Sequence, residues 1–250
     1  MLVADASGRS GHTAGVSSPD STPANAANDD DQVPAWARRT TGESRLLATI
    51  AVAGIIALQF ILPNQFTPNP AWLIPALGAV LLGVLVIGSP WRLDREEVWL
   101  RRCSLTLAVL LAFAMFWSVY HLIFALVDGS ISNDPRELLT SGVEVWLTNV
   151  LVFALGYWEM DRGGPAARAH AREPYPDFLF VQMQNPELTD PEWEPGFVDY
   201  FYMSFTNATA FSPTDVMPMS RWAKLAMMAQ SGISLITVSL VIARAVNVLK

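Results

Sequence analysis

Long apolar runs separated by short polar connections dominate the chain after residue 44. An α-helix needs about 20 residues to cross a hydrocarbon core about 30 Å thick. Five runs reach or approach that length, at residues 45–62, 72–88, 103–127, 142–160 and 223–248. Tryptophans lie at or near several of the run ends, as is typical of membrane interfaces. The pattern predicts an all-α membrane protein with about five transmembrane helices.

The aromatic run that begins near Pro195 differs from these five. It breaks after roughly 16 residues, which is too short to span the core. Irregular backbone at membrane depth is tolerated only where protein or a water-filled cavity covers its polar groups. We therefore expect a re-entrant half-helix and loop between the last two spans, sheltered by neighbouring helices.

This pattern divides the chain into three regions. Residues 1–44 are polar and nearly free of large apolar side chains, which is typical of a disordered tail. Residues 45–140 carry three of the expected transmembrane helices, and residues 141–250 carry a helix, the re-entrant loop and the final helix.

The order of elements in residues 141–250 resembles the one-pore-loop module of the potassium-channel superfamily. A helix and an aromatic half-helix lead to a Thr-rich segment, then Asp215, two residues, Pro218 and a final helix with Gly232. The family's filter, Thr-Thr-Val-Gly-Tyr-Gly-Asp, is matched loosely by Thr209-Ala210-Phe211-Ser212-Pro213-Thr214-Asp215. The chain is also similar to uncharacterised bacterial membrane proteins with several spans ahead of such a loop. The resemblance implies a homo-oligomer, with a tetramer favoured, around a shared pore.

The filter-like segment departs from the family at both glycines. Ser212 and Thr214 replace them, and Pro213 holds φ near about −65°, so we expect no potassium selectivity. A path for a monovalent cation remains a hypothesis, because hydroxyls line the segment and a half-helix ending there directs its negative pole inward. The residues of this path are Thr206, Thr209, Ala210, Phe211, Ser212, Pro213, Thr214 and Asp215. The alternative is a non-conducting structural or accessory membrane protein in which the loop is a packed plug.

Other polar residues interrupt the apolar runs. His121 is either a neutral imidazole hydrogen-bonded across helices or part of a proton relay. For Asn149 and Gln230 we expect interhelical hydrogen bonds, and for Gly232 close helix packing or a gating bend. Glu159 and Asp161 close the fourth run, where they could pair with Arg162 or ring the mouth of a cavity, and where we expect them to be solvated.

Composition excludes several classes of protein. With 52% hydrophobic and 16% charged residues, the chain is too apolar for an ordinary soluble domain. It has no glycine-rich phosphate loop, no Gly-x-Ser-x-Gly and no His-Glu-x-x-His, and its three histidines and one cysteine do not make a familiar zinc site. The net charge of −7 is not accompanied by a basic stripe. We expect no catalytic residue, no metal, no cofactor and no nucleic-acid partner.

Charge distribution and family resemblance disagree about orientation. Arginines in residues 38–45 and 92–102 place the amino terminus in the cytoplasm and the end of the final helix outside. In the potassium-channel family the pore loop enters from outside. In either orientation we expect a multi-pass protein of the bacterial cytoplasmic (inner) membrane, with the lipid bilayer as its surroundings.

Overall fold

The computed structural model describes residues 33–88, 97–129, 134–210 and 215–248. The chain divides into two units, Met1–Val33 and Pro34–Lys250, and the architecture below is that of the second. Four residues of the predicted cation path, Phe211, Ser212, Pro213 and Thr214, lie outside the described residues.

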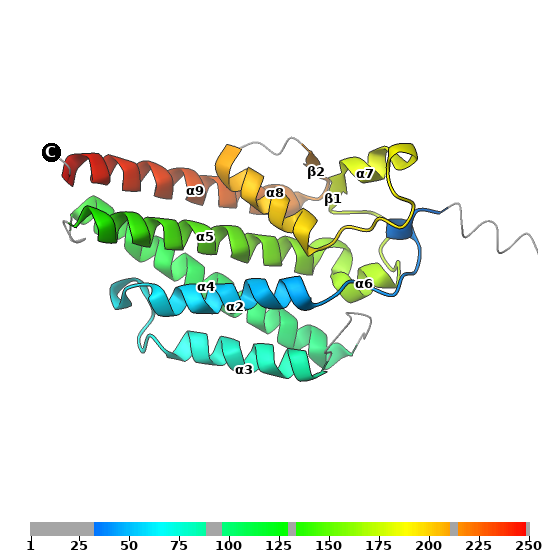
Figure 1. Cartoon of the computed structure of the whole chain (residues 1–250), viewed down its shortest axis with the longest axis horizontal. Helices are drawn as coiled ribbons and strands as arrows, with labels where there is room; N and C mark the ends of the chain where they lie inside the picture. Colours follow the sequence, from blue (N-terminus) through cyan, green and yellow to red (C-terminus); the bar gives the residue numbers. More distant parts are fainter. Residues whose placement is uncertain (1–32, 89–96, 130–133, 211–214, 249–250) are drawn as a thin grey trace, which may run out of the picture. The chain divides into compact units, whose positions relative to one another are not determined.

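Helices make up most of the described chain (Figure 1). The longer ones are α2 (Leu46–Ile61), α3 (Leu73–Gly88), α4 (Val98–Asp128), α5 (Pro135–Met160), α8 (Phe197–Ala210) and α9 (Arg221–Val248). The shorter ones are α6 (Pro165–Ala169), α7 (Val181–Gln184) and the 3-10 turns η2 (Ala35–Ala37), η3 (Asn64–Phe66), η4 (Asp161–Gly163) and η5 (Pro186–Leu188). Strands β1 (Phe178–Phe180) and β2 (Val216–Pro218) pair antiparallel. The expected all-α class is confirmed, with this small strand pair as an addition.

Three helices are long and apolar enough to cross a membrane, with candidate spans Val98–Asp128 (α4), Arg136–Gly163 (α5 and η4) and Arg221–Asn247 (α9). They support an integral membrane protein. Helices α2 and α3 have 16 residues each, so they are about 24 Å long and fall short of a core of about 30 Å. The prediction of about five transmembrane helices is therefore wrong in its count. Pro63 directly follows the C-cap of α2 and prevents that helix from continuing.

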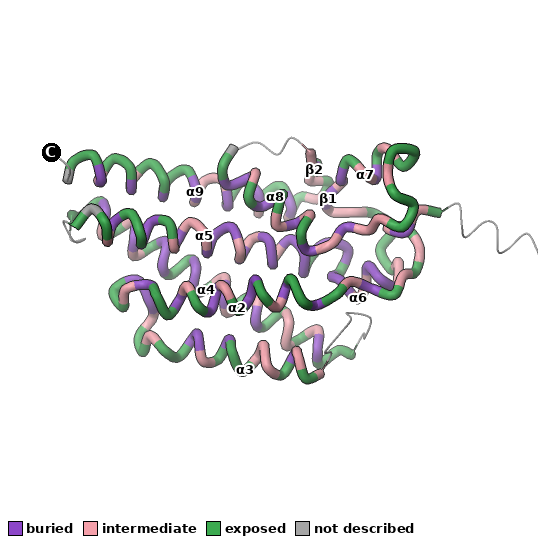
Figure 2. Tube along the Cα trace, in the orientation of Figure 1, coloured by how far each residue is buried: buried purple, intermediate pink, exposed green. Residues whose placement is uncertain are grey.

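Helix α5 is the one around which the others pack. It contacts α2, α4, α8 and α9, while α3 packs against α2 and α4. Figure 2 shows the difference: α5 is mostly buried along its middle, whereas α2, α3 and α9 keep exposed faces. These outer faces are apolar, with Ile50, Ile87 and Met228 exposed by 56%, 84% and 69%. A bilayer would solvate such faces.

The close approach of α5 and α9 depends on Gly142. A Cβ at that position would lie 2.9 Å from two methyl carbons of Val241, so a larger residue would push the helices apart. Gly232 differs, because a Cβ there would meet no described atom within 4 Å. The close contact between helices that we expected at Gly232 occurs instead at Gly142.

Candidate functional site

Helix α8 begins at one end of the helix bundle, which we call the entry end (right in Figure 1). At this end α5 finishes, α9 begins, and β2 pairs with β1 just before α9. The first turns of α8 are fixed there, because the hydroxyl of Tyr200 donates to Oδ2 of Asp161 at 2.5 Å. After α8 the chain is back at the entry end by Val216, the first residue of β2.

The other end of α8 lies about half-way along α9. The hydroxyl of Ser234 donates to the carbonyl oxygen of Ala208 at 2.6 Å. Ser234 lies thirteen positions after Arg221, or about 20 Å along the helix. On the other side, the hydroxyl of Ser204 donates to the carbonyl oxygen of Val150, deep within α5, at 2.7 Å. Helix α8 therefore ends about half-way along two of the long helices.

Gln230 holds α8 at this depth. Its side chain is fully buried, and its Oε1 accepts hydrogen bonds from Tyr157 of α5 and Asn207 of α8, both at 2.8 Å. Its Nε2 donates to the carbonyl oxygen and hydroxyl of Ser204 at 3.0 and 2.6 Å. One α9 side chain thus joins three helices.

Serines of α9 complete this contact at the end of α8. Ser231 donates to the carbonyl oxygen of Asn207 at 3.2 Å, and Ser234 donates to that of Ala208. The last carbonyls of a helix have no partner within it, so these hydroxyls supply the missing donors. We call the connected residues the tether: Tyr157, Ser204, Asn207, Gln230, Ser231 and Ser234.

The opposite face of α8 is uncovered. Tyr202 and Phe205 are 49% and 42% exposed, and Thr209 is exposed as well. The hydroxyls of Thr206 and Thr209 donate back to carbonyl oxygens one turn earlier, each at 2.9 Å. Tyr202 donates to Oδ2 of Asp215 at 2.7 Å, which brings that carboxylate to this face. Three of the predicted path residues, Thr206, Thr209 and Asp215, thus lie outside the tether, and Ala210 ends the helix.

Two other intramembrane polar residues lie apart from the tether. Nδ1 of His121 is 3.0 Å from the carbonyl oxygen of Trp117, one turn earlier in α4, and the two rings stack at 4.5 Å. The hydrogen bond observed for His121 therefore lies within α4 and does not join two helices as we had expected. Asn149 is buried in α5, and neither amide atom has a hydrogen-bond partner among the described residues.

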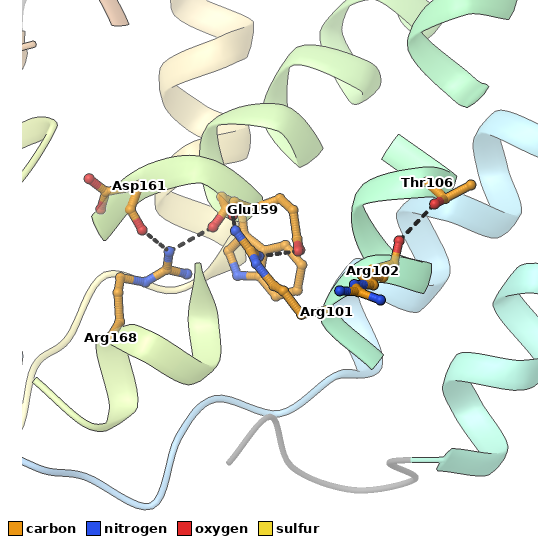
Figure 3. A network of polar contacts seen from close by, with 7 residues as sticks. Arg101, Arg102, Thr106, Glu159, Asp161 and Arg168 are labelled. Atoms are coloured by element: carbon orange, nitrogen blue, oxygen red, sulfur yellow. Dashed lines mark hydrogen bonds and ion pairs between the residues drawn. The ribbon is translucent and has the colours of Figure 1, made fainter. Parts of the chain in front are cut away.

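A cluster of charged side chains, four of them buried and three half-buried, fixes the entry end, and the sequence did not predict it. We call it the end clasp, and it comprises Glu43, Arg101, Glu159, Asp161, Arg162, Arg168 and Asp177. The expectation that Glu159 and Asp161 are solvated is wrong, because these residues are only 2% and 0% exposed. Arg168 donates to the carbonyl oxygens of Trp158 and Asp161. Figure 3 shows its contact with Asp161 and the pairing of Arg101 with Glu159.

Asp177 connects the end clasp to the start of α9. Its Oδ1 accepts from the indole of Trp222 at 2.8 Å, and its Oδ2 accepts from the backbone N–H of Arg162 at 3.1 Å. Its own N–H donates to Oδ1 of Asp161 at 2.9 Å. Gly164 is a signal in the sequence for this tight turn. Its φ of 98° favours glycine, and a Cβ added at this position would lie 2.8 Å from the carbonyl oxygen of Glu159.

Glu43 caps the amino-terminal end of α8. Its carboxylate accepts from the backbone N–H of Phe197 and, at 2.7 Å, from the indole of Trp158. Asp199 accepts from the N–H of Gly196 at 2.8 Å, so two carboxylates lie where the helix dipole favours negative charge. Burial raises the pKa of both carboxyls, and these hydrogen bonds oppose the shift. Residues 34–44, which the sequence assigned to the polar tail, thus include a residue that positions α8.

Comparison with protein-family models, curated proteins and solved structures gives no match to this chain. Its function must therefore be inferred from the geometry of α8 and its surroundings.

Proposed function

We propose that the chain is one protomer of an oligomeric, channel-like membrane protein that passes monovalent cations along the uncovered face of α8. The observation that carries this proposal is that α8 ends at mid-depth while the tether holds it to α5 and α9. With 14 residues, α8 is about 21 Å long and cannot cross the bilayer alone. It is a re-entrant half-helix whose chain returns to the entry end.

The tether meets the main physical requirement for a helix that ends inside a membrane. Backbone carbonyls at that depth need partners from protein or trapped water. Ser231 and Ser234 donate to the carbonyls of Asn207 and Ala208, so α9 provides partners at two of these positions. A helix end held in this way supports a stable re-entrant position.

Oligomerisation follows from the uncovered face. One half-helix beside one long helix cannot enclose a path, whereas cyclic symmetry brings the same face of each protomer to a common axis. That face carries Tyr202, Thr206, Thr209 and the nearby Asp215. The family resemblance favours four protomers.

The chemistry of this face suits a cation. The carboxyl-terminal end of α8 directs the negative pole of its dipole to mid-depth, and Asp215 contributes a carboxylate. A threonine that donates its proton to its own helix still presents oxygen lone pairs, so Thr206 and Thr209 remain able to face a cation. We propose weak discrimination among monovalent cations and a location in the bacterial cytoplasmic membrane.

A non-conducting role is the second candidate, and the tether itself favours it. Because Gln230 and Asn207 make their hydrogen bonds within one protomer, α8 is held without any partner copy. In that case α8 is a packed plug, and the protein has a structural or accessory function.

Ion flux in liposomes separates the two candidates. Purified protein should pass monovalent cations, and the flux should fall in Thr209→Val and Asp215→Asn. Thr106→Val is the matched control for Thr209→Val. Thr106, on α4, is exposed like Thr209 and likewise donates to the carbonyl oxygen four residues earlier. A folded oligomer that passes no cation under any potential would support the plug instead.

A further inference from the structure

An apolar groove of about 410 Å³ lies between α4, α5 and α9. Its size falls within the roughly 300–1,000 Å³ typical of ligand sites. None of its lining residues belongs to α8, so it is distinct from the face described above. Its walls include Leu105, Val109, Phe116, Phe153 and Leu225. All three helices that form it are candidate membrane spans, so hydrocarbon is its natural surrounding.

The polar lining of the groove is confined to residues near the entry end. Glu159 is the next-to-last residue of α5, and Trp222 is the second residue of α9. Tyr157 also lines the groove, but its hydroxyl is occupied by Gln230. The groove is therefore amphipathic along its length, with an apolar body and one polar mouth.

Cationic side chains flank this mouth on two walls. Arg101 precedes Leu105 by four residues and Arg221 precedes Leu225 by four, so each arginine lies one turn nearer the entry end on the same helix face as a lining residue. The charge of Glu159 is balanced by its ion pair with Arg101 (Figure 3). Arg221 is exposed and no ion pair is recorded for it in the described part of the chain. Asp177 lies beside the mouth as well, because it accepts from the indole of Trp222, so Arg221 is the exposed cation that a head group would meet there.

We propose that this groove binds one acyl chain of an anionic phospholipid from the surrounding bilayer, with the head group held at the mouth by Arg221. The apolar walls exclude water from the chain, and basic residues near a membrane surface attract anionic head groups. Trp222 lies at the mouth, where an indole is typical of the head-group region. This inference requires membrane insertion but not conduction.

Native mass spectrometry of protein released from nanodiscs of phosphatidylglycerol or phosphatidylcholine tests the proposal. The wild-type protein should retain one phosphatidylglycerol per protomer and should retain less phosphatidylcholine. Arg221→Gln should reduce the preference for phosphatidylglycerol by about fivefold, since it removes one basic residue from the mouth. Arg136→Gln, an exposed cation at the opposite end of α5, should leave the preference unchanged.

Filling the groove provides the second arm. Gly156 lines it, and a Cβ there would meet no described atom within 4 Å, so Gly156→Leu adds volume inside the groove without a backbone clash. Retention of phosphatidylglycerol should fall at least about tenfold. Gly83→Leu on α3 has the same free space outside the groove and should leave retention unchanged. Ala108→Leu fills the groove from α4 and replaces Gly156→Leu if that variant does not fold.

Three outcomes overturn the proposal. Equal retention of the two lipids by the wild-type protein removes the role of the cationic mouth. Undiminished retention in the filled variants places the lipid elsewhere. A change of oligomeric state in the filled variants, with no change in retained lipid, assigns the groove to a second copy of the chain.

Discussion

The side-chain amide of Asn207 donates a hydrogen bond to Oε1 of Gln230 at 2.8 Å, which joins the last turn of α8 to the middle of α9. Both side chains are buried, with exposures of 2% and 0%. Single interhelical hydrogen bonds in membrane proteins average only about 0.6 kcal/mol. Gln230 makes several at once, so its removal leaves partners on two other helices unsatisfied.

Gln230→Leu should therefore lower the free energy of unfolding by about 1–3 kcal/mol, the usual cost of unpaired buried polar groups. The measurement is reversible unfolding in mixed micelles. Gln65→Leu, in the exposed η3 turn, is the control and should change stability by less than about 0.5 kcal/mol. Equal stabilities of the two variants would show that the tether does not hold α8.

Removal of the Tyr200 hydroxyl should weaken the entry end. Tyr200→Phe leaves Oδ2 of Asp161 buried without its donor, so we expect a loss of about 1–3 kcal/mol in the same unfolding measurement. Tyr175→Phe is the control, because Tyr175 is 85% exposed. A Tyr200→Phe protein as stable as the wild type would mean that Asp161 is satisfied in another way.

The two carboxylates at the start of α8 should make stability depend on pH. Burial raises the pKa of Glu43 and Asp199, so in the folded protein each keeps its proton at pH values where the unfolded chain has released it. Their contribution to stability is complete below the unfolded pKa and is lost as pH rises through the raised folded pKa.

Glu43→Gln and Asp199→Asn should each flatten this fall in the free energy of unfolding between acidic and neutral pH. The check is a series of unfolding titrations across that range. Glu187→Gln, at an exposed position, should leave the slope as it is. A slope that is unchanged in both α8 variants would assign the pH dependence to other groups.

Two glycines that are similar in sequence context should respond differently to alanine. Gly142→Ala places a Cβ 2.9 Å from Val241 and should cost about 1–3 kcal/mol through overpacking. Gly232→Ala meets no described atom within 4 Å and should not destabilise the protomer. The reverse order in unfolding experiments would contradict the packing of α5 on α9.

The apolar pattern predicted the helical class and the early end of α8, because both depend on local composition. It overestimated the number of spans, because the runs at 45–62 and 72–88 were accepted as spans although the helices that form there, α2 and α3, have only 16 residues each. The sequence pattern did not predict the end clasp. Glu43, Asp161 and Asp177 are far apart in sequence, and charged residues in connections are usually solvated. Their burial depends on the fold that brings these segments together.

The distribution of basic residues predicts the orientation. The entry end carries most of those in the described segments: Arg38, Arg39, Arg45, Arg101, Arg102, Arg162, Arg168, Arg172, Arg221 and Lys224. Arg136 and Arg244 lie toward the opposite end. Positive residues favour the cytoplasmic side, so α8 should enter from the cytoplasm, opposite to the orientation in the resembled channels.

Cysteine labelling on intact spheroplasts checks this orientation in a Cys103→Ser background. Asp128→Cys, at the end of α4, should react with an impermeant thiol reagent, and Glu187→Cys should react only after lysis. The opposite pattern would place the entry end outside and restore the orientation of the channel family.

Distances between protomers at Thr209 test the central claim most directly. Spin labels at Thr209→Cys, in the Cys103→Ser background and in lipid, should give two short inter-protomer distances in a ratio of about 1.4, as four copies around one axis require. Labels at Thr106→Cys on α4 should give longer distances. An absence of short distances at Thr209 in folded, lipid-embedded protein would contradict a shared path beside α8.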